Sequence, residues 1–524
     1  PLVVHRRSEV HFLSDIDKAQ KPKQAMSLEE STTRPLKNIA WLFLGLATAG
    51  LVVRLVNICN PLNSWDGLDE MNYALIARSL MSGDLPFHGP FDHKPIALYY
   101  IFALFFEIFG YTVTAIRLMP FAAIGLTSWL LYRIAKKQLP SHLHLVALCA
   151  ILFMATCASF GNGGHASNTE ILQMPVFAGW WLVALNCPPE SNWRRSLLLG
   201  ALAGLAAQIN YLGGFVLAIG TAFMLAWPLF PNVSRPKFAT FFVGGLLALG
   251  AFIATGLLML APLIVAGDLS QYFHMQFGAL SGYQGVLNDD KLVRAVFSVA
   301  ISACFFVSLL ACMGWHDRSL GEVTPAAKTQ LVQLAVVFFV TLFAIALTKR
   351  LYPHYFNLLI VPSTLILLIL LASTSARALR SFSFVAVVLA TLLVARGAWD
   401  VYLKDWHSNF RQQHEIAQLT QEIRDHAQPG ERVLLLNLNH TLYFLADVTP
   451  ATRFVFRGQI FQDKFLSSIR SSLVAELDIA LANNPVFVMA CFDNIAADFR
   501  PLVEKMLALN YRGYQLSGYD ECQV

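Results

Sequence analysis

The sequence predicts an all-α polytopic membrane protein with a small C-terminal α/β domain, and three observations lead to this fold class. Of the 524 residues, 56% are hydrophobic and only 14% are charged, whereas a soluble domain usually carries about 25% charged residues. The apolar residues fall in runs of roughly 20, the length that a helix needs to cross a hydrocarbon core about 30 Å thick. These runs do not alternate polar and apolar residues, as the strands of a membrane barrel do.

We expect about eleven transmembrane helices. Because backbone polar groups inside lipid must be paired within their own segment, each apolar run should be a helix. Lys and Arg gather in every second connection, as the positive-inside rule requires of cytoplasmic loops. The predicted spans are 38–58, 117–135, 143–160, 171–187, 196–212, 213–230, 238–264, 295–313, 329–348, 355–372 and 381–398.

The chain is expected to divide into three parts. Residues 1–37 are polar and basic and should form a cytoplasmic tail with no cleavable signal peptide. Residues 38–398 form the transmembrane domain, and residues 399–524 form a soluble domain on the outer side. Helix-like patterns over 412–428 and 497–509, and strand-like patterns over 432–438, 453–456 and 485–490, predict the α/β character of this last part. It has no Gly-rich phosphate loop, so no nucleotide is assigned to it. Cys491 and Cys522 either form a disulfide or remain two thiols.

The first outer loop, residues 59–116, is predicted to hold two helices at the membrane interface. Pro95–Gly110 is apolar, but it is short and carries Glu107. If it crossed the membrane, every later basic loop would lie outside. We therefore expect it to lie along the membrane surface. Glu70–Met81 has helical spacing of apolar residues and is expected to be the second interfacial helix.

Candidate catalytic residues lie in this first outer loop. Asp66, Asp69 and Glu70 are three carboxylates within five positions. Holding them together at a membrane surface is costly unless they act as a base or bind a metal or a cationic partner. The alternative is a solvated turn in which Asp69 caps the following helix. Lys94, at the start of the apolar helix, suits a lipid phosphate, and its alternative role is contact with headgroups in general.

Later outer loops add further candidates. His165 and Glu170 come from the segment GNGGHASNTE and should share a face, although Glu170 could also serve only the dipole of its helix. The segment KRLYPHY, residues 349–355, is an exception to the positive-inside trend, which favours a bound anion over a solvated loop. Its candidate residues are Arg350, Tyr352, His354 and Tyr355.

Several function classes are disfavoured. The net charge of +5 does not indicate nucleic-acid binding, because most of the basic residues lie in short loops where they set topology. Asp66, Asp69, His165 and His354 lack the tight spacing of metal ligands, so a divalent metal is not favoured and no cofactor is assigned. Transport is disfavoured because charged residues are nearly absent from the middle of the spans.

Five stretches, in order, resemble the GT-C class of lipid-dependent glycosyltransferases, in particular bacterial members related to protein O-mannosyltransferases and to the lipid A aminoarabinose transferase. These stretches are LDEMNYALIARSLMSGDLPF, HKPIALYYIFALFFEIFG with TAIRLMP, the TE of SNTEILQMP, YPHYFNLLIVPS and ERVLLLNLNHTLYFLADVTPATRFVF. They cover nearly the whole chain. Asp66, just before the usual acidic pair, and Ile96, where many members have a second proline, depart from the family pattern.

The resemblance implies inverting transfer of a sugar from a polyprenyl-phosphate donor on the outer face of a bacterial inner membrane. Asp69 matches the catalytic aspartate, and Lys94 matches the lysine at the donor phosphate, where Arg350, His354 and Tyr355 would assist. The supporting or acceptor-side positions are Asp66, Glu70, His165, Glu170 and Tyr352. The expected partners are the lipid-linked sugar, membrane lipids and a lipid, glycan or protein acceptor. The alternative is a catalytically silent relative that acts as a scaffold or accessory subunit.

Overall fold

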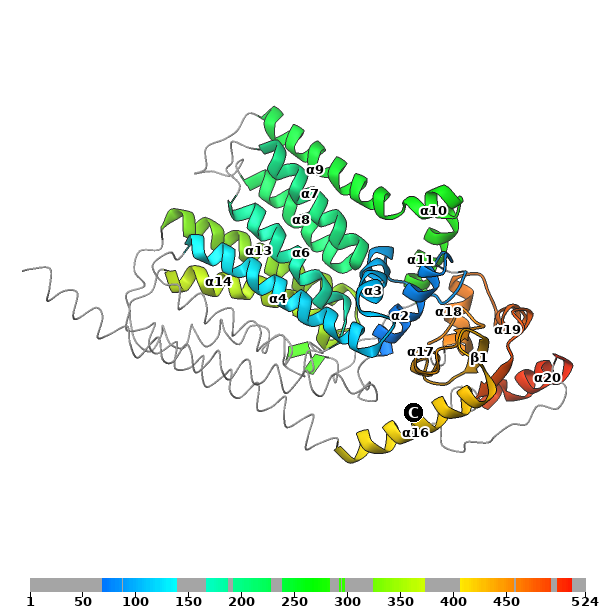
Figure 1. Cartoon of the computed structure of the whole chain (residues 1–524). Coiled ribbons are helices and arrows are strands. Elements are labelled where there is room, and N and C mark those ends of the chain that lie inside the picture. Colours follow the sequence, from blue (N-terminus) through cyan, green and yellow to red (C-terminus); the bar gives the residue numbers. More distant parts are fainter. Residues whose placement is uncertain are drawn as a thin grey trace, which may run out of the picture.

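The computed structural model describes residues 68–86, 88–138, 166–186, 192–227, 238–282, 292–293, 295–296, 324–372, 406–456, 459–491 and 497–510. Within these ranges the chain is mostly helical. Long helices run side by side in a bundle, and shorter helices and the C-terminal part of the chain gather at one end of it (Figure 1).

The long helices coincide with predicted spans. Among the described residues, four helices are long and apolar enough to cross a membrane, namely Val113–Lys137, Phe241–Met259, Pro325–Leu347 and Pro353–Leu370. The predicted helical character of the chain is therefore confirmed, with four candidate membrane spans among the described residues. The bundle consists of α4 (Val113–Gln138), α6 (Thr169–Asn186), α7 (Asn192–Ile209), α8 (Tyr211–Ala226), α9 (Phe238–Met259), α13 (Pro325–Leu347), and η4 (Pro353–Leu359) continuing into α14 (Ile360–Ala372).

The remaining predicted spans, 38–58, 143–160, 295–313 and 381–398, lie wholly or almost wholly outside the described residues, as does the tail 1–37. The number of eleven spans therefore stays a prediction.

Glycines of α7 allow the backbones of α7 and α9 to approach each other closely. A Cβ atom added to Gly200 of α7 would lie 2.0 Å from the carbonyl oxygen of Ala248 in α9. One added to Gly204 would lie 2.7 Å from the carbonyl oxygen of Phe252. Small residues allow helix backbones to approach each other inside a membrane, where apolar burial alone gives no preference for protein over lipid.

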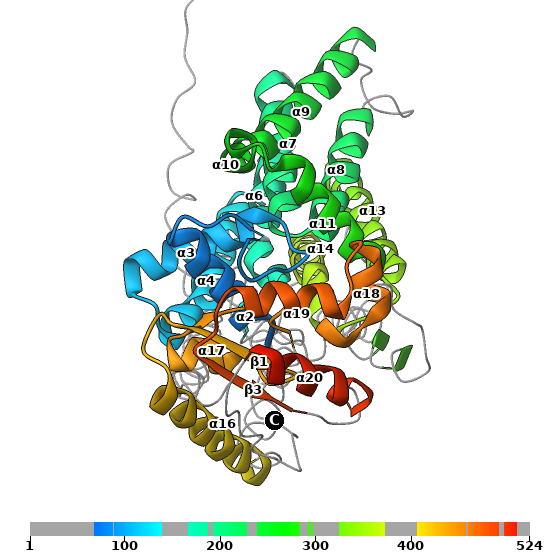
Figure 2. The ribbon, with the colours of Figure 1, turned by 90° about the vertical axis from the view of Figure 1, so that its right-hand side faces the viewer.

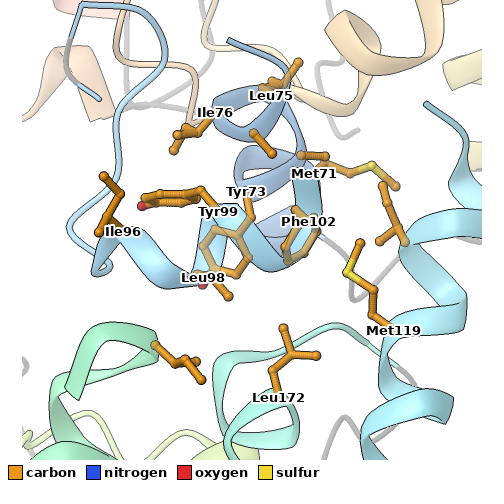
Figure 3. Packing of buried hydrophobic residues seen from close by; sticks show 14 of the residues in the cluster. Met71, Tyr73, Leu75, Ile76, Ile96, Leu98, Tyr99, Phe102, Met119 and Leu172 are labelled. Atoms are coloured by element: carbon orange, nitrogen blue, oxygen red, sulfur yellow. The ribbon is translucent and has the colours of Figure 1, made fainter. Parts of the chain in front are cut away.

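Two shorter helices occupy the predicted first outer loop. They are α2 (Leu68–Met81) and α3 (Ile96–Phe109). With 14 residues, α3 is about 21 Å long and therefore too short to span a core about 30 Å thick. The rings of Tyr73 and Phe102 pack edge to face between the two helices at 5.7 Å, and Met119 of α4 and Leu172 of α6 extend this cluster (Figure 3).

The connection between the predicted spans 238–264 and 295–313 contains a helix that the sequence did not predict. After α10 (Ala261–Ala266) the chain turns at Gly267, in the left-handed region with φ 80°. It then forms α11 (Leu269–Gly282). The buried residues of α11 recur at spacings of three and four, the helical period, and are Tyr272, Met275, Gln276 and Ala279.

The C-terminal part combines helices with a small parallel sheet of order β2-β1-β3. The expected strand over 453–456 is wrong: this stretch forms no strand, because it contacts the loop before α3, where the Phe91 N–H donates to the Arg453 carbonyl at 2.8 Å. The elements are α16 (Trp406–His426), β1 (Arg432–Leu436), α17 (Thr441–Ala446), β2 (Thr449–Pro450), η6 (Gln459–Phe461), α18 (Asp463–Ser468), α19 (Leu473–Ala482), β3 (Phe487–Ala490), η7 (Ala497–Phe499) and α20 (Arg500–Asn510).

This C-terminal part packs against α2 and α3, as the view onto the end of the bundle shows (Figure 2). Arg78 of α2 forms an ion pair with Asp447 at 2.5 Å. The rings of Tyr111 and Phe444 lie 4.3 Å apart. Cys491, just after β3, is disulfide-bonded, and Cys522 lies outside the described residues.

Candidate active site

Asp69 lies at the beginning of α2 and lines a cavity of about 130 Å³ at the end of the bundle. A carboxylate in the first turn of a helix is favoured by the positive end of the helix dipole. Its half-buried side chain faces the same cavity as Lys94. The structure therefore brings together the two residues that the sequence nominates as base and phosphate ligand.

The loop that carries Lys94 is held by its backbone. The Gln276 amide of α11 donates to the carbonyl oxygens of Asp92 at 3.1 Å and of Lys94 at 3.2 Å. The Tyr99 hydroxyl also donates to the Lys94 carbonyl, at 3.2 Å. Pro95 follows in an extended conformation and lets α3 begin at Ile96. These contacts fix the backbone of Lys94 at the mouth of the cavity.

Asp92 and His93 are site residues that the sequence analysis did not nominate. The Asp92 carboxylate accepts from the His93 backbone N–H at 2.7 Å, and His93 Nδ1 lies 2.8 Å from the same oxygen. Both residues line the cavity beside Asp69. Their position directly before Lys94 was the available signal, and His93 opens the stretch HKPIALYYIFALFFEIFG that resembles the family, but neither residue was given a role.

The segment from Lys349 to Tyr355 forms one side of the cavity. Tyr352, His354 and Tyr355 line it, and the Tyr352 and His354 rings stack 5.5 Å apart. The flanking Lys349 and Leu351 have φ angles of 54° and 49°, a left-handed conformation that costs a non-glycine residue of order 1–3 kcal/mol. Such strain persists only where the surrounding structure imposes it.

Arg350 lines a second, larger cavity. This cavity has a volume of about 350 Å³ and lies between α8, α11 and α13. The guanidinium donates to the Tyr352 hydroxyl at 3.0 Å. Both cavities include His93, Lys94 and Tyr355, so they meet at Lys94. Apolar side chains form much of the second cavity, namely Leu212, Phe215, Leu280, Ala344 and Leu347.

Glu170 is buried behind the segment that carries His354. Its carboxylate accepts from the Asn210 side-chain amide at 2.7 Å and lies 4.0 Å from His354 Nε2. Glu170 lines neither cavity. It is therefore placed to orient His354.

Glu70, the neighbour of Asp69, points into the protein. Its carboxylate pairs with the buried Arg117 guanidinium of α4 at 2.6 Å and accepts from the Ser167 backbone N–H at 2.8 Å. Glu70 thus ties α2 to α4 and to the chain entering α6. Asp66 and His165 lie outside the described residues.

The two carboxyl groups that line the cavity, on Asp69 and Asp92, have pKa values shifted in opposite directions. Burial raises the pKa of Asp69 above its ordinary value, and the neighbouring Lys94 and His354 reduce this rise. Burial also acts on Asp92, but the contacts with His93 and the charge of Lys94 outweigh it and hold the pKa of Asp92 below its usual range. Asp69 therefore binds a proton more readily than Asp92 does. Across the described ranges, no group of three or more His, Cys, Asp or Glu side chains could hold a metal ion.

Comparisons with known proteins show what the chain is similar to. Residues 93–259 match the family model described as dolichyl-phosphate-mannose-protein mannosyltransferase. The structure is similar to that of ArnT from Cupriavidus metallidurans bound to undecaprenyl phosphate, with a TM-score of 0.51 and 15% identity over 91% of this chain and 96% of that chain. The chain has this fold, and the expected relationship to the GT-C glycosyltransferases that use polyprenyl-phosphate sugars is confirmed.

Particular relatives are similar over a shorter region. The undecaprenyl phosphate-alpha-4-amino-4-deoxy-L-arabinose arabinosyl transferase of Pseudomonas paraeruginosa is 32% identical over 177 residues. The protein of the same name from Pseudomonas aeruginosa strain LESB58 is also 32% identical over 177 residues. Each alignment spans 32% of this chain and 30% of the relative, so the similarity covers less than a third of those proteins.

Proposed function

We propose that this protein transfers a sugar from a polyprenyl-phosphate donor to an acceptor at the outer surface of the membrane, with inversion at the anomeric carbon. One observation supports the proposal above the others. Lys94 lies where a small polar cavity containing Asp69 meets a larger cavity with apolar walls. A polyprenyl-phosphate sugar has the same three parts in the same order: a polar sugar, an anionic phosphate and an apolar chain.

The chemistry needs few groups. The phosphate is a good leaving group when its charge is neutralised as it departs, and Lys94 is placed to do this with Arg350 from one cavity and His354 from the other. Asp69 would take the proton of the acceptor hydroxyl on the opposite face of the anomeric carbon. A single displacement inverts that carbon and needs no second nucleophilic carboxylate.

The acceptor carries a hydroxyl and is a membrane lipid, a glycan or a protein. The relatives support a lipid-linked donor, because the matching structure contains undecaprenyl phosphate and the similar transferases are named for an undecaprenyl-phosphate sugar. In this proposal the protein resides in a bacterial inner membrane, with residues 1–37 in the cytoplasm and residues 399–524 in the periplasm. The transmembrane domain, 38–398, has eleven spans and lays α2 and α3 along the outer surface.

Replacing Lys94 by Ala is expected to weaken use of the donor. A hydrogen bond to a charged group contributes about 1.5–3 kcal/mol, so the donor KM should rise by about 10-fold or more while the protein still inserts and folds. The measurement is sugar transfer from purified polyprenyl-phosphate sugars in detergent or vesicles. Lys136→Ala, at the exposed end of α4, is the matched control. Unchanged KM and kcat in Lys94→Ala would contradict the phosphate role.

The proposed topology is tested by thiol labelling of intact cells. A cysteine at the exposed Lys328, in the first turn of α13, should be protected from a membrane-impermeant reagent. A cysteine at the exposed Asp478 of α19 should react. Permeabilised cells, in which both sites should react, provide the control. Labelling of position 328 but not of position 478 in intact cells would reverse the orientation.

A further inference from the structure

One wall of the catalytic cavity comes from the C-terminal part of the chain. We call this wall the roof; it consists of Phe456, Gln459, Gln462 and Phe465. It faces the cavity that Asp69 and Lys94 line from the other side. The roof lies about 200 residues beyond the end of the matched family region at residue 259, so its side chains are a feature of this chain that the family match does not cover.

The position of the roof is fixed by α11. A Cβ atom added to Gly278 would lie 2.8 Å from the carbonyl oxygen of Ser468, and one added to Gly282 would lie 3.3 Å from the Cα of Phe465. Helix α11 therefore touches the backbone of α18 directly. Because Gln276 of the same helix holds the loop carrying Lys94, α11 sets the distance between the roof and the phosphate-binding side.

The roof offers one buried hydrogen-bond acceptor, on Gln459, that no described residue uses. The Gln459 backbone N–H donates to the Phe456 carbonyl at 3.1 Å, and the Leu466 N–H donates to the Gln462 carbonyl at 3.0 Å, so both glutamines project from an ordered turn. The Gln459 Oε1 atom is buried and has no hydrogen-bond partner among the residues that the structure describes. A buried carbonyl oxygen without a partner is costly, and a hydroxyl or N–H group of a bound ligand would satisfy it.

The roof contains no charged group. Its polar groups are two neutral amides, beside the two aromatic rings. A sugar that carried an ammonium or a carboxylate group toward this wall would meet no opposite charge on it, and an unpaired charge is far more costly to bury than a paired hydroxyl. The charged side chains of the cavity lie on the other walls, where Asp92 is already paired with His93.

The size of the cavity limits the ligand further. Its volume is about 130 Å³, whereas pockets for drug-sized ligands usually have ~300–1,000 Å³. The space inside the cavity therefore suits one sugar residue.

We propose that Gln459 and Gln462 are specificity-determining residues that select a single uncharged sugar on the donor, by hydrogen bonds to its hydroxyl or N-acetyl groups. The inference rests on the proposed glycosyl transfer and names its donor class. It also distinguishes this chain from the relatives named for 4-amino-4-deoxy-L-arabinose, a sugar with an ionisable amino group.

The test compares donors in competition. Undecaprenyl phosphates carrying glucose, mannose, N-acetylglucosamine, 4-amino-4-deoxyarabinose or glucuronate are incubated with the full-length protein and membranes that supply acceptor, and release of undecaprenyl phosphate is followed for each. At least one uncharged sugar should exceed both charged sugars by about 10-fold or more in kcat/KM. Gln459→Leu should lower kcat/KM for that sugar about 10-fold.

A glutamate in place of either roof glutamine should shift the donor preference toward the amino sugar. Gln459→Glu, and Gln462→Glu at a position that is exposed and tolerates a charge, should each raise the use of the amino sugar relative to the uncharged sugar by about 10-fold. Gln428→Leu, at an exposed position in the same part of the chain, should change nothing. Binding of undecaprenyl phosphate without sugar, measured by thermal shift, should be the same in all these variants.

The outcomes separate this inference from the proposed function. Turnover of an uncharged donor with the same donor ratios in all roof variants would overturn the inference alone, as would a preference of the unmodified protein for a charged sugar. Absence of turnover with every donor would refute the glycosyl transfer and the inference together.

Discussion

Asp69→Asn is expected to abolish sugar transfer while leaving the protein folded and inserted. General-base catalysis contributes about 10²–10⁴-fold to a rate, and the amide retains the shape of the carboxylate but cannot take a proton. Asp69 is half-buried at the first turn of α2, so replacing it removes charge and leaves packing intact. The measurement is the single-turnover transfer rate at saturating donor.

The control for this variant is Asp478→Asn, an exposed aspartate of α19 outside both cavities. It should transfer sugar at the unmodified rate. If Asp69→Asn remained active, the base would have to be sought elsewhere, first at Asp66, three residues earlier in the chain. Asp66→Asn is therefore made in parallel, and loss of transfer in that variant alone would move the assignment.

The pH dependence of kcat/KM is a second test of Asp69 as the general base. A base must be deprotonated, so activity should fall as the pH drops through the pKa of Asp69. Since burial raises this pKa, the acid limb of kcat/KM should lie above the ordinary range of an aspartate. Lys94 lowers the pKa of Asp69; in Lys94→Ala the acid limb should therefore move to still higher pH. A limb that did not move would count against Asp69 as the titrating group.

Glu70→Gln is expected to destabilise the protein by about 3–5 kcal/mol, the typical cost of leaving one partner of a buried ion pair uncompensated. The Glu70 carboxylate and the Arg117 guanidinium are both buried and lie 2.6 Å apart. Removal of the negative charge leaves Arg117 without its counter-ion inside the protein. The measurement is the thermal unfolding midpoint in detergent, which should fall clearly.

Two further variants make this prediction specific. Glu107→Gln, on the exposed side of α3, should leave the midpoint unchanged. The double replacement Glu70→Met with Arg117→Met should recover much of the loss, because replacing a buried ion pair by apolar side chains is often neutral or stabilising. If Glu70→Gln unfolded at the same temperature as the unmodified protein but lost transfer, Glu70 would belong with the reacting groups instead.

The contrast between Asp69 and Glu70 shows how far the sequence could be interpreted. Acidic residues before a helix, followed by a lysine before an apolar helix, indicated a site near Asp69 and Lys94, and the structure places both in one cavity. The division of roles between neighbouring carboxylates was not accessible, because it depends on Arg117 and Ser167, which reach Glu70 only in the folded chain.

Other parts of the fold were missed for the same physical reason. The apolar runs predicted the long helices well, because the length and polarity of a span are local properties. Helix α11 was hidden because its buried face includes the polar Gln276, whose hydrogen bonds go to the distant loop at Asp92. The roof was missed because nothing near Gln459 in the sequence indicates that it meets Asp69 across nearly four hundred residues.

The roof also has a consequence for the timing of biosynthesis. A ribosome makes the loop with Lys94 long before the turn with Gln459. The cavity that both line cannot exist until the segment with Gln459 has reached the same end of the bundle as α2 and α3 (Figure 2). A chain in which that segment has not yet arrived therefore carries Asp69 and Lys94 but lacks the wall of the cavity that Gln459 and Gln462 supply.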